Sequence, residues 1–325
     1  MGNTRGRAVI AGATGFIGQR LVRELRDQGY DIARIGRNGP DARWDDASAV
    51  RTLIDGSKLV VNLAGKSVNC RYTDRNRDEI LRSRIDTTRA FRQAIATSAN
   101  PPRVWLNAST ATIYRYSLDR PMTETNGDLG TGFSADIAQA WEVEFFAGEL
   151  PATRRVALRM AIVLGDGPAT AALVRLARFG LGGPQLDGWW FPHRRYRGIG
   201  TKPTSTGAQT HHSHGRQKFS WIHIDDVVNA VKFIVDNAAL DGPVNLSAPQ
   251  ISDNRTLMST LRRRVGAVVG LPAFRWMLEP AMWILRTEPE LVLKSRWVTP
   301  ERLLQAGYTF AWPDLEPAIN DVVKR

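Results

Sequence analysis

Near its start the chain reads Gly12-Ala13-Thr14-Gly15-Phe16-Ile17-Gly18. A short apolar run from Arg7 to Ala11 precedes this segment and is typical of a buried strand. Apolar residues then recur at helical spacing until Gly29, and Asp31 to Ile35 forms the next apolar run. A strand, a glycine-rich turn, a helix and a second strand in this order predict the first βαβ unit of a dinucleotide-binding fold.

The glycines of this turn have separate roles. Gly12 allows the tight turn, Gly15 lets the backbone approach a pyrophosphate, and Gly18 lets the helix pack closely on the strand. The free N–H groups at the start of the helix favour a negative charge. We therefore predict that a nicotinamide dinucleotide binds here, with its pyrophosphate contacted by Gly12, Thr14, Gly15, Phe16, Ile17 and Gly18.

The end of the second strand indicates which nicotinamide cofactor is used. About 20 residues after the glycine turn, an NAD site carries Asp or Glu to bind the ribose 2′-hydroxyl. This chain has Gly36-Arg37-Asn38 instead. Because a guanidinium pairs bidentately with a phosphate, we predict NADP(H) in preference to NAD(H), with Arg37 reading the 2′-phosphate. A solvated surface arginine is the alternative.

Strand and helix patterns alternate through the first half of the chain. The expected strands and helices are 59–62, 78–97, 104–107, 135–146, 155–159, 219–223 and 244–246, in chain order. Such alternation predicts an α/β Rossmann fold, a doubly wound parallel sheet with helices on both faces. After about residue 250 the pattern is mostly helical, with Pro280 interrupting an apolar helix, and it predicts a smaller C-terminal lobe.

These patterns suggest a division of the chain into two parts. Residues 1–165 and about 219–246 form the expected NADP-binding Rossmann domain. Residues of about 166–218 and 247–325 form the expected substrate lobe, which contains a basic inserted loop at about 189–218.

The basic loop holds about half of the formal net charge of +12. It contains Arg194, Arg195, Arg197, Lys202, Arg216 and Lys218, and no Asp or Glu. A solvated loop is our main interpretation, and binding of a substrate phosphate is an alternative. Nucleic-acid binding is disfavoured because no DNA- or RNA-binding signature accompanies the charge. A metal site at His211, His212 and His214 is disfavoured because no Cys lies nearby and no helical His spacing occurs, so we expect no metal.

Other features bear on location. The chain lacks the run of about 18 apolar residues that a membrane span needs, and the glycine turn starts too early for a presequence before it. Cys70 is the single cysteine and cannot form an internal disulfide, which agrees with a reducing compartment. We expect a cytoplasmic protein with no membrane partner.

Several segments, taken together and in order, resemble the extended short-chain dehydrogenase/reductase superfamily. Beside the glycine turn they are Asn62-Leu63-Ala64-Gly65, Ser109-Thr110-Ala111, Ser220 to Asp226, Gly242 to Pro249 and Lys294 to Leu304. The nearest match is the NAD(P)-dependent epimerase/dehydratase-like family with a C-terminal domain of unknown function. The resemblance covers nearly the whole chain apart from the basic loop. It implies that Asn62, Leu63, Ala64 and Gly65 pass near the ribose and that Ser109 lies beside the nicotinamide and the substrate carbonyl. The resemblance also suggests a homodimer, which is common in the superfamily but which nothing in these residues requires.

The catalytic pattern departs from the superfamily. The resemblance implies acid/base work by a tyrosine and a lysine one helical turn apart, but this helix has Phe133 and Ile137 at those places. No Tyr-x-x-x-Lys occurs anywhere in the sequence. Ser109 fits the role of holding the substrate oxygen. Tyr114 is our candidate substitute acid because it closely follows the end of a strand, and a packing tyrosine is the alternative.

Other polar residues near the strand ends favour structural roles. His223 alternates with apolar residues on an expected strand, and Asp225 and Asp226 start a helix, where carboxylates cap free N–H groups. Arg159 has two possible roles. It could neutralise an anionic group of a substrate or cofactor, or it could pair with a local acid.

The leading hypothesis is an NADP-dependent oxidoreductase or epimerase that acts on a small polar carbonyl or hydroxyl compound. The alternative is a catalytically silent NADP(H)-binding sensor that lacks the tyrosine and lysine pair. The two differ in whether any carbonyl compound is turned over.

Overall fold

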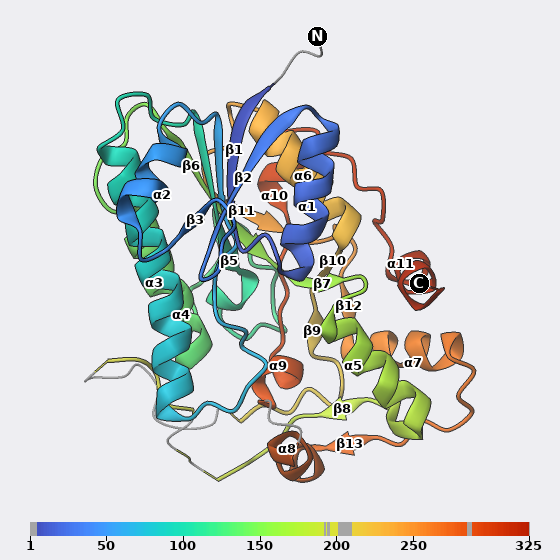
Figure 1. Cartoon of the computed structure of the whole chain (residues 1–325). Coiled ribbons are helices and arrows are strands. Elements are labelled where there is room, and N and C mark those ends of the chain that lie inside the picture. The colour runs from blue at the N-terminus through green and yellow to red at the C-terminus, as the bar shows by residue number, and fades with distance from the viewer. Residues whose placement is uncertain (1–4, 192, 194–195, 201–209, 285–287, 325) are drawn as a thin grey trace.

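A seven-stranded parallel sheet forms the centre of the molecule (Figure 1). The computed structural model describes residues 5–191, 193, 196–200, 210–284 and 288–324. The sheet has the order β11-β6-β5-β4-β1-β2-β3. Its strands are β1 (Gly6–Ala11), β2 (Tyr30–Gly36), β3 (Ala42–Arg43), β4 (Leu59–Asn62), β5 (Val104–Thr110), β6 (Arg154–Met160) and β11 (Gly242–Leu246). The reversal of strand order beside β1 confirms the predicted doubly wound Rossmann sheet.

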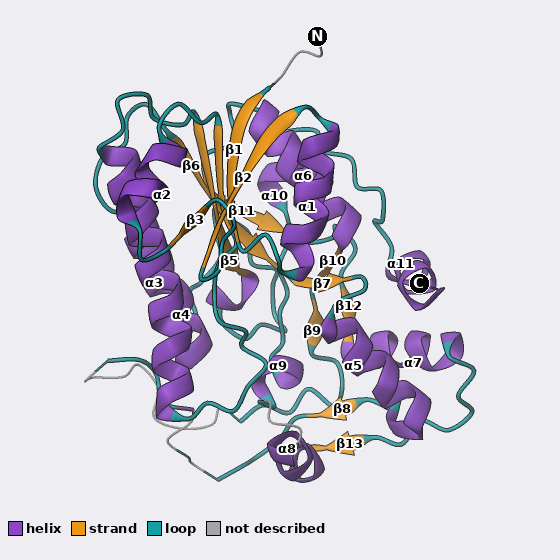
Figure 2. Ribbon diagram, viewed as in Figure 1, coloured by secondary structure: helices purple, strands orange, loops and turns teal. Residues whose placement is uncertain are grey.

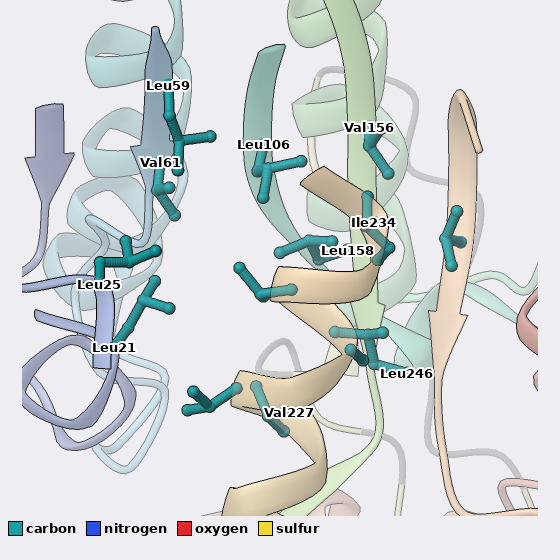
Figure 3. Close-up of a cluster of buried hydrophobic side chains, with 14 of the residues drawn as sticks. Leu21, Leu25, Leu59, Val61, Leu106, Val156, Leu158, Val227, Ile234 and Leu246 are labelled. Atoms are coloured by element: carbon teal, nitrogen blue, oxygen red, sulfur yellow. The ribbon is translucent and has the colours of Figure 1, made fainter. Parts of the chain in front are cut away.

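Helices cover both faces of this sheet (Figure 2). One face carries α1 (Phe16–Asp27), α6 (Ile224–Asp236) and α10 (Glu301–Gln305), and the other carries α2 (Ala47–Ile54), α3 (Asp74–Ala96) and α4 (Phe133–Phe146). Successive strand residues point to opposite faces: Ile10 joins the core under α1 and α6, and Val9 joins the core under α2 to α4. Figure 3 shows the first of these cores, with Leu21 and Leu25 of α1 and Val227 and Ile234 of α6.

The remaining part of the chain surrounds the carboxyl ends of the strands. Three two-stranded sheets pair β7 (Ile162–Leu164) with β10 (Trp221–His223), β9 (Lys218–Phe219) with β12 (Ser252–Asp253), and β8 (Gln185–Leu186) with β13 (Ala273–Phe274). The helical segments here are η1 (Ala111–Ile113), α5 (Pro168–Leu176), the π-helix η2 (Ala177–Leu181), α7 (Asn254–Arg264), α8 (Arg275–Ile284), α9 (Glu290–Leu293) and α11 (Leu315–Lys324). The expected mostly helical C-terminal part is therefore present.

Two local expectations were wrong. The single strand expected at 219–223 is two strands, because the N–H of Ser220 bonds to the carbonyl of Arg296 and separates β9 from β10. Pro280 lies inside α8 and does not interrupt it. The carbonyl that loses its donor to Pro280 belongs to Trp276, an exposed residue where water can replace the missing bond.

The C-terminal part also contributes to the main core. Leu303 of α10, with Tyr308 and Phe310 after it, packs among side chains of the parallel sheet. No helix in the described part of the chain has the length and apolar character that crossing a membrane requires.

Candidate functional site

The glycine turn lies at the carboxyl end of β1. Gly12 has φ +75°, and a Cβ atom there would lie 2.6 Å from the carbonyl oxygen of Leu63. A Cβ atom on Gly18 would overlap the carbonyl oxygen of Gly12. Helix α1 starts after Gly15 with no side chain capping its first turn. The turn therefore offers free N–H groups in a space that only glycines leave open, which fits a pyrophosphate.

Asn62 shapes the neighbouring loop. It ends β4 beside Ala11 of β1 and is fully buried. Its amide nitrogen donates to Asn107 Oδ1 at 2.8 Å, and its amide oxygen accepts from the N–H of Ala64 at 3.1 Å. The side chain thus fixes the course of Leu63, Ala64 and Gly65 next to Gly12, and it acts through that backbone because its own polar atoms are used internally.

Arg37 follows β2 at the same edge of the sheet. Ile35 of β2 pairs in register with Ala11 of β1, which places the turn after β2 next to the glycine turn. Arg37 is exposed, and no hydrogen bond or ion pair to it is found in the described part of the chain. Arg34 on the same strand instead forms an ion pair, with its Nε atom 3.6 Å from Asp41 Oδ2. The guanidinium of Arg37 is thus available to an anion.

Ser109 and Tyr114 belong to one buried polar network. Ser109 Oγ donates to Glu142 Oε1 at 2.5 Å. The guanidinium of Arg159 donates to both oxygens of Glu142, at 2.8 and 2.6 Å, and to Tyr114 Oη at 2.7 Å. Tyr114 Oη in turn donates to Asn245 Oδ1 at 2.9 Å. Three strand ends and α4 therefore contribute to one connected cluster.

The electrostatics of this network favour a neutral phenol at Tyr114 and a charged guanidinium at Arg159. Burial raises the pKa of the Tyr114 phenol, even though Arg159 beside it acts in the opposite direction. Burial lowers the pKa of Arg159, but the hydrogen bonds and charge of Glu142, together with the contact to Tyr114, outweigh this effect and raise the pKa overall. Of the two interpretations of Arg159, the structure shows the pairing with a local acid, namely Glu142.

Apolar side chains occupy the places of the missing tyrosine and lysine. Phe133 and Ile137 are buried at the start of α4, in a cluster with Tyr72 and Ile80. The Phe133 ring lies 4.6 Å from the ring of Tyr72, and the guanidinium of Arg77 lies 3.9 Å from its centroid. Neither side chain can exchange a proton.

A pocket opens beside Phe133 and contains a lysine that the sequence did not single out. Its lining includes Thr131, Phe133, Tyr116, Asp187, His211 and Lys294. Lys294 Nζ donates to the carbonyl of Thr112 at 2.9 Å, and burial lowers the pKa of this lysine to about 8. In the sequence, Lys294 was only the first residue of the segment from Lys294 to Leu304 that resembles the family. It was not identified as a site residue, because its contact with Thr112 joins segments that are distant in sequence.

Parts of the basic loop border this pocket. The ring of His211 stacks on Tyr116 with centroids 3.5 Å apart, and Tyr116 Oη donates to Asp187 Oδ2 at 3.0 Å. Tyr196 Oη donates to Glu279 Oε1 at 2.7 Å. Within the described ranges, no group of three His, Cys, Asp or Glu side chains is arranged to hold a metal ion. Arg194, Arg195 and Lys202 lie outside the described residues.

The residues expected to be structural make internal contacts. His223 is fully buried, and its Nδ1 accepts from the N–H of Asp225 at 3.2 Å. Asp226 accepts from the N–H groups of Ala311 and Trp312, at 2.8 and 2.9 Å. Asp226 therefore ties α6 to the C-terminal segment, a contact that differs from the expected helix cap.

Comparison with protein families agrees with this fold and with a nicotinamide cofactor. The model of the NAD dependent epimerase/dehydratase family matches residues 8–175, and the model of a domain of unknown function, DUF1731, matches residues 274–322. The chain belongs to the NAD dependent epimerase/dehydratase family. This membership confirms the resemblance identified from the sequence and the expectation of a nicotinamide dinucleotide cofactor.

Individual relatives match over nearly the full length. The chain is 28% identical to the epimerase family protein YfhF of Bacillus subtilis over 97% of each chain. It is 29% identical to the mouse epimerase family protein SDR39U1, over 98% of this chain and 99% of the relative. The crystal structure of human SDR39U1 with NADPH is similar, with a TM-score of 0.80 and 25% identity, over 98% of this chain and 99% of that one.

Proposed function

We propose that this protein is an NADP(H)-dependent oxidoreductase or epimerase that acts on a small polar carbonyl or hydroxyl compound. The observation that carries the proposal is that the glycine turn and Arg37 lie at one edge of the sheet, and that Arg37 has no hydrogen bond or ion pair among the described residues. The presence of NADPH in the structure of human SDR39U1 supports the same cofactor here.

The chain's own residues fit this cofactor in a defined way. The turn from Gly12 to Gly18 would hold the pyrophosphate, Arg37 the 2′-phosphate, and the backbone from Asn62 to Gly65 would pass the ribose. When bound, NADPH supplies the hydride. Ser109 is buried at the end of β5.

The directions of the hydrogen bonds at Ser109 and Lys294 indicate a different role for each residue at the substrate oxygen. Because the Ser109 hydroxyl donates to Glu142, its oxygen is left to accept a hydrogen bond, as from a substrate alcohol. An ammonium has three donors, and Lys294 uses one on Thr112. We propose that Lys294 donates a hydrogen bond to the substrate carbonyl oxygen from the pocket. Ser109 orients the alcohol form of the substrate. Tyr114 either completes the network that holds Ser109 in place or supplies the proton.

Turnover of a carbonyl panel with NADPH tests the proposal. The wild type should consume NADPH with at least one member, and Lys294→Met and Ser109→Ala should each lower kcat/KM about 100-fold or more. Lys58→Met, an exposed lysine at the start of β4, is the matched control and should leave the rate unchanged. NADPH binding without turnover of any member would contradict an enzymatic role.

A second candidate function is a catalytically silent NADP(H)-binding sensor. The burial of Phe133 and Ile137 where a proton donor would stand favours it. The same assay separates the two candidates, because a sensor binds NADPH and leaves the whole panel unchanged. The cytoplasmic location, the domain boundaries and the homodimer expected from the sequence stay predictions.

A further inference from the structure

Helix α8 has its apolar side turned to solvent. Trp276, Trp283 and Ile284 are 66%, 56% and 69% exposed. Together with Pro280 they lie at positions i, i+4, i+7 and i+8, which is one side of a helix. The opposite side buries Leu278 together with a charged pair, in which Arg275 Nε lies 3.2 Å from Glu279 Oε1 and both side chains are buried. A surface helix of a soluble protein normally has the reverse arrangement.

Neighbouring segments extend this apolar surface. Val268 is 95% exposed and Phe179 is 77% exposed, and Leu271 between their segments is exposed as well. The N–H of Leu271 bonds to the carbonyl of Gly180 at 2.9 Å, so the loop before β13 lies against η2. Figure 1 shows α8, β8 and β13 together at one end of the molecule, opposite the N-terminus. We name Phe179, Val268, Leu271, Trp276, Trp283 and Ile284 the α8 face. Exposed apolar side chains gathered at one end of a molecule mark a docking site.

The charge around the α8 face is positive. Arg175 and Arg178 are exposed on α5 and η2, in the segment that leads to Phe179, whereas Arg263 on α7 lies with its Nη2 atom 3.9 Å from Glu316 Oε1. From residue 254 to residue 284 the chain contains five arginines and one acidic residue, Glu279, which is buried. The guanidinium of Arg71 lies 4.3 Å from the ring centroid of Trp283. Exposed tryptophans with arginines around them are the composition of surfaces that lie in the headgroup region of an anionic bilayer.

We propose that the α8 face docks this protein on the surface of a membrane that contains anionic phospholipid. The apolar side chains enter the headgroup boundary, and the surrounding arginines pair with lipid phosphates. The protein lies on the bilayer and does not cross it. This proposal reverses the expectation of no membrane partner, which rested on the lack of an apolar run of membrane-spanning length. It is independent of the proposed catalytic activity.

Sedimentation with lipid vesicles tests the proposal on the full chain. The wild type should bind vesicles of equal parts phosphatidylglycerol and phosphatidylcholine, and should bind pure phosphatidylcholine much less, because the arginines need anionic lipid. Loss of two exposed arginines in Arg175→Gln/Arg178→Gln should weaken partitioning about thirtyfold, which is about 2 kcal/mol for two basic residues. Arg23→Gln/Arg26→Gln removes two exposed arginines from α1 and is the matched control.

Changes to the apolar side chains test the other half of the proposal. Trp276→Ser/Trp283→Ser should abolish vesicle binding and leave the thermal unfolding midpoint unchanged, since both side chains are exposed. Val143→Ser/Leu304→Ser, at exposed positions on α4 and α10, should keep wild-type binding. Equal binding by the wild type and the tryptophan variant would overturn the proposal. A wild-type dimer that the tryptophan variant converts to monomer, with no vesicle binding by either, would also overturn it and assign the α8 face to a second copy of the chain.

Discussion

Replacing Glu142 with alanine should destabilise the protein strongly. The carboxylate accepts hydrogen bonds from Arg159 at 2.8 and 2.6 Å and from Ser109 at 2.5 Å, and both charged side chains are buried. Glu142→Ala leaves the guanidinium of Arg159 buried without its counter-charge. Loss of one partner of a buried ion pair costs about 3–5 kcal/mol. We expect the free energy of unfolding to fall by about that amount.

A double-mutant cycle measured by urea unfolding separates the ion pair from other effects. Arg159→Met removes the charge and keeps an apolar side chain of similar length, so the double variant Glu142→Ala/Arg159→Met should lose less than the sum of the single losses. Asp78→Ala, which breaks an exposed pair with Arg82, is the control and should change stability by only about 0.5 kcal/mol. A loss below about 1 kcal/mol for Glu142→Ala, or additive losses, would refute the reasoning.

Three further predictions concern the glycine turn, the pocket lysine and a helix cap. Gly18→Ala should abolish NADPH binding in a fluorescence titration, because its Cβ would overlap the carbonyl of Gly12; retained affinity would contradict the geometry of the turn. Turnover should be constant below a pH of about 8 and fall above it, because the ammonium of Lys294, whose pKa is lowered to about 8, loses its proton there. A pH profile that is flat through this range would exclude Lys294 as the donor. Thr73→Ala should lower stability by about 1 kcal/mol in urea unfolding, since Thr73 Oγ1 caps α3 by accepting from the N–H of Asn76.

Much of the Rossmann sheet could be predicted from periodicity and turn residues. The first strand and the expected helix at 135–146 were found within two residues of β1 and α4, because long buried elements carry strong local patterns. Helix α2 was not predicted. It has only eight residues, and a segment this short is hard to tell from a strand or a loop by periodicity.

The side of α8 that packs inward could not be predicted. The apolar residues of this segment repeat at helical spacing, and that pattern predicts a buried apolar side. The structure buries Leu278 of this pattern, but it also buries Arg275 and Glu279 and leaves Trp276 in solvent. Periodicity shows that a helix has two sides, but only the tertiary partners determine which side is covered.

The candidate site depends in the same way on contacts between distant segments. The glycine turn is local in sequence, and the structure places it between β1 and α1 as expected, while its contacts to a pyrophosphate stay a prediction. Two contacts arise only when the fold brings distant segments together. Glu142 comes to lie beside Arg159, and Lys294 comes to lie beside Thr112. Sequence reasoning therefore identified Ser109 and Tyr114 but missed the group that joins them.

The central claim is that Arg37 makes this chain an NADP(H)-binding protein. Its most direct test is a fluorescence titration of the wild type, Arg37→Ala and the control Arg23→Ala with NADPH and with NADH. The wild type should prefer NADPH, and Arg37→Ala should lose about tenfold to a hundredfold in NADPH affinity, the value of a hydrogen bond to a charged group, with NADH affinity unchanged. An unchanged ratio of NADPH to NADH affinity in Arg37→Ala would contradict the account.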